Sequence, residues 1–278
     1  MRGWLFFAVA SVSFAFGCAG CGGSGSVATT TSTAGLRVVH GSPDAGAVDV
    51  RLNAGGGEAI ATTLTYGRVS AYDAIPPGGY AIAILPAGGS TPTLTCTGAS
   101  LLAGTNYTVV VGGRVAKGIG TSTGLQCELF AEPTFATLSG DYTLSVHHAS
   151  PAAAALGDST VSFGIFIPRT TAYDVPSASV TFAGPIGTAV SIGTTVTSKQ
   201  LGVTAAPGVG IWVSPPTSAP PFSVLATILP SAGQAGAAGV SGAADTGNVL
   251  PLGSLVNFSL YLIDGSGGPT TNLVGAFD

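Results

Sequence analysis

Val39-His40-Gly41-Ser42-Pro43 returns later in the chain as His147-His148-Ala149-Ser150-Pro151, each time at the end of a strand-like run. Each copy is followed by a second strand-like segment, residues 48–53 in the first case and 161–167 in the second. In the first of these segments, apolar and polar residues alternate strictly, which is typical of a half-buried β-strand.

Two later landmarks recur in the same order as the opening motif. Pro77-Gly78-Gly79-Tyr80 corresponds to Pro207-Gly208-Val209-Gly210, and Asn106-Tyr107-Thr108 corresponds to Asn257-Phe258-Ser259. The number of residues between the first and second copy of each landmark grows along the chain. The order therefore predicts two tandem copies of one unit, the second lengthened by insertions.

The remaining segments predict an all-β protein. Further strand-like runs are residues 80–85, 107–111, 179–183, 209–213, 223–229 and 256–263, with turns rich in Gly and Pro between them. No sustained helical period occurs, and residues 152–156 are too short to predict a helix. We expect two antiparallel β-sandwich domains, residues 36–138 and 139–278. Residues 230–253, rich in Gly and Ala, predict a long mobile loop.

The first 20 residues read as an export signal. Arg2 precedes an apolar core at residues 4–16, which is too short to span a bilayer and is followed by small residues. Cys18-Ala19-Gly20-Cys21 comes next and resembles a bacterial lipoprotein signal. We expect lipidation of Cys21, with Cys18 as the alternative site and an ordinary cleaved signal as the alternative process. Residues 21–35 would form a flexible tether.

The lipoprotein resemblance implies a place in the cell. The protein would be exported and held in the cell envelope by its lipid. Gly22, in place of an Asp, resembles outer-membrane sorting in a Gram-negative host. The domains would then face either the periplasm or the cell surface.

The other two cysteines, Cys96 and Cys127, form an even pair in an exported chain. An oxidising compartment favours a disulfide between them. In the chain-entropy model that bond stabilises the fold by about 3–4 kcal/mol.

Charge excludes one class of partner. Charged residues make up 7% of the chain, against about 25% in typical soluble domains, and 8 basic residues face 12 acidic ones. No basic patch is present, so nucleic-acid binding is not expected. The surface must consist mainly of small neutral residues, which argues against electrostatic steering of a charged partner.

The stretch Leu36-Arg37-Val38-Val39-His40-Gly41-Ser42-Pro43-Asp44-Ala45-Gly46-Ala47-Val48-Asp49-Val50 resembles the opening of the domain-of-unknown-function family numbered 4397. Ile75-Pro76-Pro77-Gly78-Gly79-Tyr80 matches a later stretch of that family. The resemblance covers residues 36–113 and is weaker in the second copy, where Ala152 to Ala155 follow Pro151. It implies immunoglobulin-like sandwiches in an exported bacterial protein, and it implies no activity.

His40, Ser42, Asp44 and Asp49 invite a catalytic interpretation. A nucleophilic triad needs a serine on a strained turn and partners that converge from elsewhere, whereas these residues lie close together in sequence. The favoured interpretation is a turn in which Ser and Asp side chains bind local backbone amides. We expect Asp49 to face solvent beside Arg51, and we predict no catalytic residue.

A metal site is also not expected. His147 and His148 are adjacent on a strand, so their side chains point to opposite faces. Loops could gather Asp44, Asp49, Glu58 and Asp73 around calcium, but no spaced Asp-rich loop is present. We predict no metal and no cofactor.

One aromatic residue suggests a third class of function. Trp212 lies in a strand-like run before two prolines, and exposed aromatic rings can stack on sugars. Tyr72, Tyr80 and Tyr173 offer no flat platform beside it, which favours a packing role.

The leading hypothesis is a non-enzymatic envelope lipoprotein that presents β-sandwich domains for binding, adhesion or structural spacing. Its partners would be the membrane, through the lipid, and an envelope protein or polysaccharide. The alternatives are a secreted hydrolase or metal-dependent enzyme using the loops around His40 to Asp49, and a carbohydrate-binding module.

Overall fold

A computed structural model describes residues 32–53, 56–132, 143–156, 159–166, 178–184, 186, 196–199, 209–214, 226–228, 248–250, 257–266 and 271–277. The predicted signal, Cys18, Cys21, most of the tether and Tyr173 lie outside these residues, as does the side chain of Trp212. Residues 32–278 form one compact unit. In the described part of the chain, no helix is long and apolar enough to cross a membrane.

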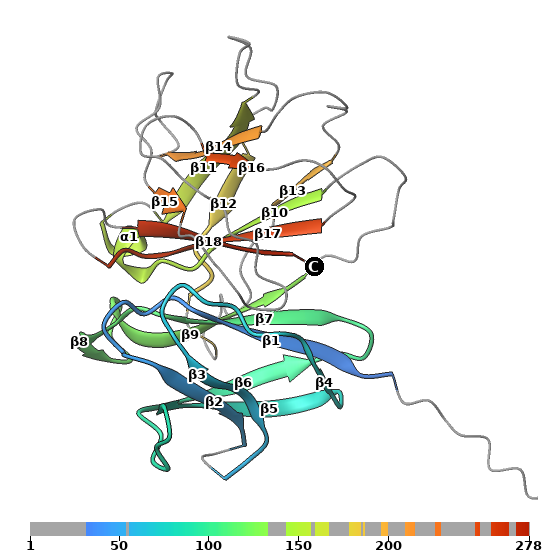
Figure 1. Ribbon diagram of the computed structural model, residues 1–278, viewed down its shortest axis with the longest axis vertical. Coiled ribbons are helices and arrows are strands. Elements are labelled where there is room, and N and C mark those ends of the chain that lie inside the picture. Colours follow the sequence, from blue (N-terminus) through green and yellow to red (C-terminus); the bar gives the residue numbers. More distant parts are fainter. Residues whose placement is uncertain are drawn as a thin grey trace, which may run out of the picture. The chain divides into compact units, whose positions relative to one another are not determined.

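Strands dominate both halves of this unit (Figure 1). The first half contains β1 (Ala34–His40), β2 (Val48–Leu52), β3 (Ala59–Leu64), β4 (Asp73–Ile75), β5 (Gly78–Pro86), β6 (Leu94–Leu101), β7 (Asn106–Gly112), β8 (Arg114–Ile119) and β9 (Gly124–Ala131). The second half contains β10 (Thr143–His148), α1 (Pro151–Ala155), β11 (Thr160–Phe166), β12 (Ala178–Thr181), β13 (Val196–Lys199), β14 (Val209–Ser214), β15 (Ala226–Ile228), β16 (Asn248–Leu250), β17 (Asn257–Asp264) and β18 (Thr271–Phe277).

Four sheets form two corresponding pairs, which differ at one edge strand: β8 follows β7 in sequence, whereas β15 precedes β17. The β1 sheet has the order β4-β1-β7-β9-β8, and the β10 sheet has the order β13-β10-β17-β18-β15. The β2 sheet has the order β3-β2-β5-β6, and the β11 sheet has the order β12-β11-β14-β16. The strand that carries each copy of the opening motif thus occupies the same place in its own sheet.

The registers agree with the sequence landmarks as well. Leu36 on β1 pairs with Tyr107 on β7, and Leu144 on β10 pairs with Phe258 on β17. These four residues occupy matching positions in the two copies read from the sequence. The landmarks therefore mark structurally matching strand pairs.

The expectation of antiparallel sheets holds for most of the described strand pairs but not for the motif strands. β1 pairs with β7, and β10 with β17, in parallel. In each half, the strand that follows the motif belongs to the other sheet, so the motif strand does not form a hairpin with it. It lies instead beside a strand much later in the chain, and the sheets are mixed.

The core of the first half lies between the β1 and β2 sheets, which Figure 1 shows as two layers. Leu36, Val109 and Leu129 point into it from the β1 sheet, and Val50 and Ile84 from the β2 sheet. The strands predicted in this half at residues 48–53, 80–85 and 107–111 are confirmed as β2, β5 and β7.

The β1 sheet is buried on its other face too. Val39, Val110 and Phe130 pack there against Tyr261 and Ile263 of β17. Burial on both faces explains why β7 is an almost continuous apolar run rather than an alternating one.

Two expectations about the second half need correction. α1 forms where the sequence predicted no helix, because Ser150 caps it by accepting a hydrogen bond from the Ala153 amide and Pro151 opens its first turn. β16 lies within the segment expected to be one long loop. The other residues of the segment 230–253 lie outside the described residues.

Candidate functional site

His40, from the opening motif, is buried at the end of β1 and uses both ring nitrogens within its own turn. Its Nδ1 accepts a hydrogen bond from the Ser42 amide at 3.2 Å, and its Nε2 lies 2.7 Å from the Gly46 carbonyl oxygen. A ring that accepts at Nδ1 and donates at Nε2 is neutral. Burial lowers the pKa of His40, and the Gly46 hydrogen bond partly opposes this shift.

The second copy of the motif repeats this contact. His148 is fully buried, and its Nδ1 accepts from the Ser150 amide at 3.3 Å. The motif histidine therefore fixes the turn that follows its strand in both halves.

Asp44 binds backbone rather than a reacting group. Its carboxylate accepts hydrogen bonds from the Val115 amide at 2.8 Å and the Ala116 amide at 3.0 Å, both on β8. Ser42 Oγ lies 3.4 Å from Asp44 Oδ1, which is long for a hydrogen bond between a hydroxyl and a carboxylate. The arrangement holds the edge strand β8 against the motif turn.

Asp49 is buried, with 5% of its surface exposed, so the expectation that it faces solvent is wrong. Its two oxygens accept from the Thr63 amide at 2.7 Å and the Gly88 amide at 3.0 Å. A neighbouring strand and a turn converge on this carboxylate, because Thr63 lies on β3 and Gly88 in the turn after β5. Asp49 therefore connects β2 with β3 and with that turn.

The largest polar group lies where the β1 sheet packs on the β10 sheet. We call it the junction cluster; it comprises Arg37, Thr108, Glu132, His147, Ser259 and Tyr261. All six are buried, with at most 5% of their surface exposed. Five of these side chains come from β1, β7, β10 and β17, and Glu132 directly follows β9.

Hydrogen bonds connect the junction cluster internally. Arg37 donates from Nε to Thr108 Oγ1 at 3.0 Å and from Nη2 to the Tyr261 hydroxyl at 2.7 Å. The Thr108 and Tyr261 hydroxyls both donate to Glu132 Oε1 at 2.5 Å. The cluster thus joins β1 and β7 to β17 through one carboxylate.

Two cationic or ionisable groups flank that carboxylate. His147 Nε2 lies 3.0 Å from Glu132 Oε2, and Arg37 Nη2 lies 3.8 Å from Glu132 Oε1. Burial by itself would raise the pKa of Glu132, but His147, Arg37 and the hydrogen bonds lower it to about 2. Glu132 is therefore an anion held in place by its neighbours.

Aromatic rings complete the surroundings of the cluster. The His147 and Tyr261 rings stack at 4.7 Å, and the Arg37 guanidinium lies 4.5 Å from the centre of the Tyr72 ring. Such contacts hold the rings and the guanidinium in fixed positions. No member of the cluster is exposed enough to meet a substrate.

Two further buried carboxyl groups, Glu128 on β9 and Asp264 at the end of β17, accept side-chain hydrogen bonds. Gln126 Nε2 donates to Glu128 Oε1 at 3.0 Å, and burial raises the pKa of Glu128 well above its usual range. Ser150 Oγ donates to Asp264 Oδ1 at 2.6 Å, and burial also raises the pKa of Asp264. Both carboxyl groups favour the neutral form more than an exposed carboxyl does.

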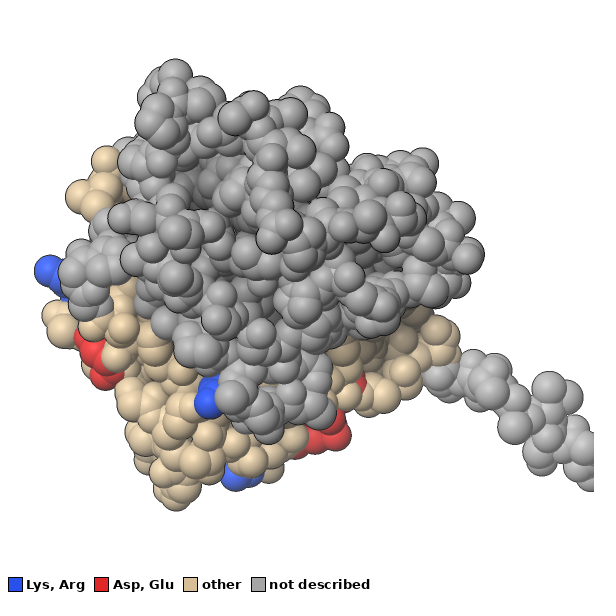
Figure 2. Space-filling model, turned by 45° about the horizontal axis from the view of Figure 1, so that its top comes forward, with Lys and Arg blue, Asp and Glu red and all other residues tan. Residues whose placement is uncertain are grey.

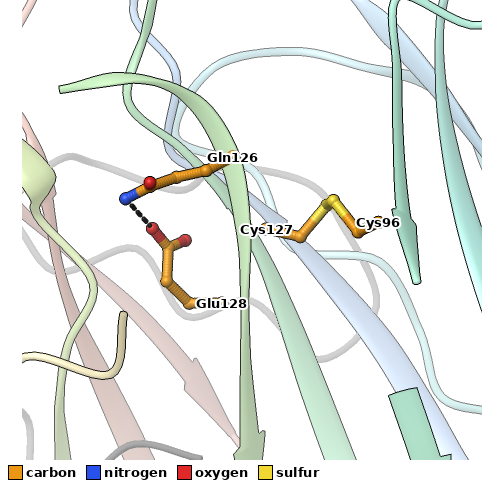
Figure 3. The surroundings of a disulfide bond; sticks show 4 residues. All are labelled: Cys96, Gln126, Cys127 and Glu128. Atoms are coloured by element: carbon orange, nitrogen blue, oxygen red, sulfur yellow. Dashed lines mark hydrogen bonds between the residues drawn. A yellow bond between two sulfur atoms is a disulfide. The ribbon is translucent and has the colours of Figure 1, made fainter. Parts of the chain in front are cut away.

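The predicted disulfide is confirmed. Cys96 on β6 and Cys127 on β9 are bonded, which joins the β2 sheet to the β1 sheet. Figure 3 shows Gln126 and Glu128 on the side of β9 opposite to Cys127. This alternation follows from the period of two along a strand.

The proposed calcium ligands do not come together. In the described part of the chain, no group of three or more His, Cys, Asp or Glu side chains could hold a metal ion. Burial raises the pKa of Asp73, and the charge of Glu58 adds to the shift. Tyr80 donates from its hydroxyl to the Pro76 carbonyl at 2.7 Å, inside its own turn.

Sequence reasoning missed the junction cluster. One signal was available: Arg37 is a lone charge within the apolar run of β1, and such a residue is buried only with partners. Its partners could not be named, because Tyr261 lies 224 positions away. The arrangement can fix how two sheets pack, and it presents no accessible reactive group.

Comparison with curated proteins finds no match. A family model described as "Domain of unknown function (DUF4397)" matches residues 34–157. The match confirms the resemblance seen over residues 36–113 and extends through β10 and α1, past the boundary predicted at residue 138. Residues 34–157 are therefore similar to the DUF4397 family.

Proposed function

We propose that this protein is a non-enzymatic lipoprotein of the cell envelope. Two tandem immunoglobulin-like sandwiches, carried on a lipid tether, would act as one stiff module for binding or spacing. The matching strand orders of the two halves support the tandem architecture. The apolar leader and the cysteine after it support the lipid anchor.

One observation carries the non-enzymatic part of the proposal. The polar residues that the motif places together are engaged by backbone: His40 by the Ser42 amide, Asp44 by two β8 amides and Asp49 by one β3 amide and one turn amide. A catalytic group needs access to a substrate and freedom to exchange a proton. These side chains hold turns instead.

The stiffness of the module rests on the junction cluster. A charged group buried with several hydrogen-bonding partners favours one packing arrangement over others, because any slip would leave Glu132 or Arg37 without partners. The apolar contacts of Val39 and Phe130 with Tyr261 lie alongside. The two sandwiches would therefore keep a fixed relation.

The surface fits a spacer or a binder of neutral ligands. In the view of Figure 2, the charged side chains of the described residues are few and separated by neutral ones. Such a surface attracts ions weakly. This favours recognition by shape and local contacts.

Metabolic labelling with palmitate tests the anchor. In a Gram-negative expression host, we expect the wild-type protein to be labelled and to sediment with membranes. Cys21→Ser should abolish both, and Cys18→Ser, the matched control three residues away, should change neither. A labelled, membrane-bound Cys21→Ser protein would overturn the predicted site, and an unlabelled wild type would overturn the anchor.

The enzyme alternative is tested with the same purified protein. Wild type and Asp44→Ala are incubated with ester, peptide and glycan substrates, with and without calcium or zinc. We expect no turnover. Turnover by the wild type that Asp44→Ala abolishes, while its circular dichroism spectrum is retained, would refute the proposal.

A further inference from the structure

Two buried carboxyl groups, one from each half, lie where the β1 sheet packs on the β10 sheet. We call Glu128, on β9, and Asp264, at the end of β17, the carboxyl pair. Neither side chain is exposed, and Glu128 Oε2 and Asp264 Oδ2 have no hydrogen-bond partner among the described residues. A buried carboxylate oxygen without a donor is unfavourable, whereas a protonated carboxyl carries no charge to solvate.

Glu128 faces the second half of the chain rather than the core of its own half. Cys127 points into the core between the β1 and β2 sheets, and Figure 3 shows Glu128 on the opposite side of β9. Phe130, two positions further along the strand, packs on that side against Tyr261 and Ile263 of β17. Separation of the two halves would therefore expose Glu128 without unfolding the first half.

Asp264 is held against the first half through both of its neighbours in sequence. Ile263 packs in the same apolar cluster as Val110, the residue of β7 that pairs with Glu128. The Gly265 carbonyl accepts a hydrogen bond from Arg114 Nη2 of β8. Both members of the carboxyl pair thus belong to the contact between the halves.

The surroundings of Glu128 disfavour its ionised form. Gln126 Nε2 donates to Oε1, and the carboxyl packs on Gly112, where even a methyl group would lie 2.7 Å from Oε2. Burial raises the pKa of Glu128; the Gln126 hydrogen bond opposes this shift, and the charge of Asp264 adds to it.

Four groups on the surrounding elements act on Asp264. Burial raises its pKa, whereas the Ser150 hydroxyl, the Ala152 amide and the charge of Arg114 lower it. The charge of Asp44, in the motif turn, raises it again. Burial therefore outweighs the donors, and the pKa of Asp264 stays above its ordinary value.

The other ionisable groups of this contact set the pH range of interest. Glu132, with a pKa of about 2, is charged at any higher pH and stays paired with Arg37 and His147. Burial lowers the pKa of His40 from 6.5, so His40 is neutral above that pH. Between pH 6.5 and pH 8.5, the carboxyl pair can therefore be followed apart from Glu132 and His40.

We propose that the carboxyl pair makes the contact between the two halves sensitive to pH. The contact is closed while Glu128 Oε2 and Asp264 Oδ2 carry protons, and it loosens as the pair ionises. The inference rests on the proposed stiff module, which would be stiffest in acid and would loosen as the pH of its surroundings rises.

Linkage gives the direction of this effect. The pKa of each carboxyl is raised in the closed form, so the stabilisation is full below the ordinary values of 4.5 and 3.8. It is lost as pH rises through the raised values. In between, the ratio of open to closed protein grows by up to about tenfold per pH unit for each carboxyl.

Access to a buried thiol tests this inference. Ala149 is fully buried in the apolar cluster that contains Val110 and Ile263, so Ala149→Cys places a thiol that a reagent reaches once this cluster opens. Labelling of residue 149 in the purified full-length protein is measured by mass spectrometry of its peptide and divided by the rate of a model thiol. We expect this ratio to rise at least about tenfold from pH 6.5 to pH 8.5.

Ala61→Cys is the matched probe, because Ala61 is buried in the core of the first half. Its labelling should not follow the rise, since the first half stays folded. Equal rises at residues 61 and 149 would show unfolding of the first half instead of a loosened contact, and would overturn the inference.

Glu128→Gln combined with Asp264→Asn, in the Ala149→Cys protein, should flatten the pH response because neither amide ionises. Glu128→Gln alone should reduce it, and this single variant decides the matter if thermal melting shows that the combined variant does not fold. Asp73→Asn is the control: the pKa of Asp73 is also raised, but its charged neighbour is Glu58 of the first half. A rise that survives removal of the carboxyl pair, or that Asp73→Asn abolishes, would overturn the inference.

The inference and the proposed function fail separately. Slow labelling of residue 149 at every pH would refute the pH sensitivity and leave the stiff module intact. Fast labelling at every pH, in a protein that melts cooperatively, would refute the stiff module as well.

Discussion

Arg37 donates a hydrogen bond from Nη2 to the hydroxyl of Tyr261, 224 residues later, at 2.7 Å. The same hydroxyl donates to Glu132, so one tyrosine connects a buried cation with a buried anion. These two contacts fix the second half of the chain against the first. They also yield the first prediction.

Tyr261→Phe removes the hydroxyl and keeps the ring. We expect the free energy of unfolding to fall by about 1–3 kcal/mol, because Arg37 and Glu132 each lose a buried hydrogen bond. Urea denaturation measures the change. Tyr80→Phe is the control: its hydroxyl binds only the Pro76 carbonyl in an exposed turn, so a loss as large as that of Tyr261→Phe would contradict the assignment.

Glu128→Gln should stabilise the protein increasingly as pH rises. Burial raises the pKa of Glu128 in the folded state, so its contribution to stability is fully present below the unfolded value of 4.5. That contribution is lost as pH rises through the folded pKa, whereas the amide never ionises. Melting temperatures from pH 5 to pH 9 should diverge in favour of the variant.

Glu58→Gln serves as the control for that series, because Glu58 is exposed. Its melting curve should run parallel to the wild type across the same range. Parallel curves for Glu128→Gln as well would show that Glu128 is ionised in the folded protein at neutral pH.

His40→Asn tests the role of the motif histidine. Asparagine can still accept from the Ser42 amide but loses the contact with the Gly46 carbonyl, so we expect a loss of about 1–2 kcal/mol at pH 7. Because the folded pKa of His40 is lowered, its contribution is full above 6.5 and is lost as pH falls through the folded value.

Stability should accordingly depend less on pH between 7 and 5 in His40→Asn than in the wild type. Urea titrations at several pH values measure the slope. A slope unchanged by the substitution would mean that another group controls the acid response.

Replacing both disulfide cysteines by alanine should lower stability by about 3–4 kcal/mol, because the bond closes a loop with a sequence separation of 31. Reduction of the wild type should produce a similar loss in urea denaturation. If dithiothreitol left the unfolding midpoint unchanged, the bond would not be contributing in solution.

Much of the fold was predictable because strands have a local signal. The alternating residues of β2 and the apolar run of β7 gave their positions, and the repeated landmarks gave matching strand pairs. The disulfide followed from the number of cysteines and the predicted compartment. Parallel pairing of β1 with β7 was not predictable, since it depends on which sheet the next strand joins.

The candidate site was less predictable. Asp44 lies in a turn, as predicted, but the backbone amides that it binds are not local: they belong to Val115 and Ala116 on β8. Asp49 was placed on the wrong side, because a strand with one polar face can still bury a carboxylate that accepts from amides of a neighbouring strand and a turn. Glu132 gave no local signal, since its hydrogen-bond donors Thr108, Ser259 and Tyr261 come from two distant strands, β7 and β17.

The sequence by itself determined the all-β class, the resemblance of residues 36–113 to a family of unknown function and the pairing of Cys96 with Cys127. These depend on local periodicity, a local motif and a count of thiols. Only the tertiary structure decided that the β1 sheet is buried on both faces and that Arg37, Glu132 and Tyr261 meet there. Burying a charge is favourable only where partners converge on it, and convergence of distant strands is a property of the folded chain.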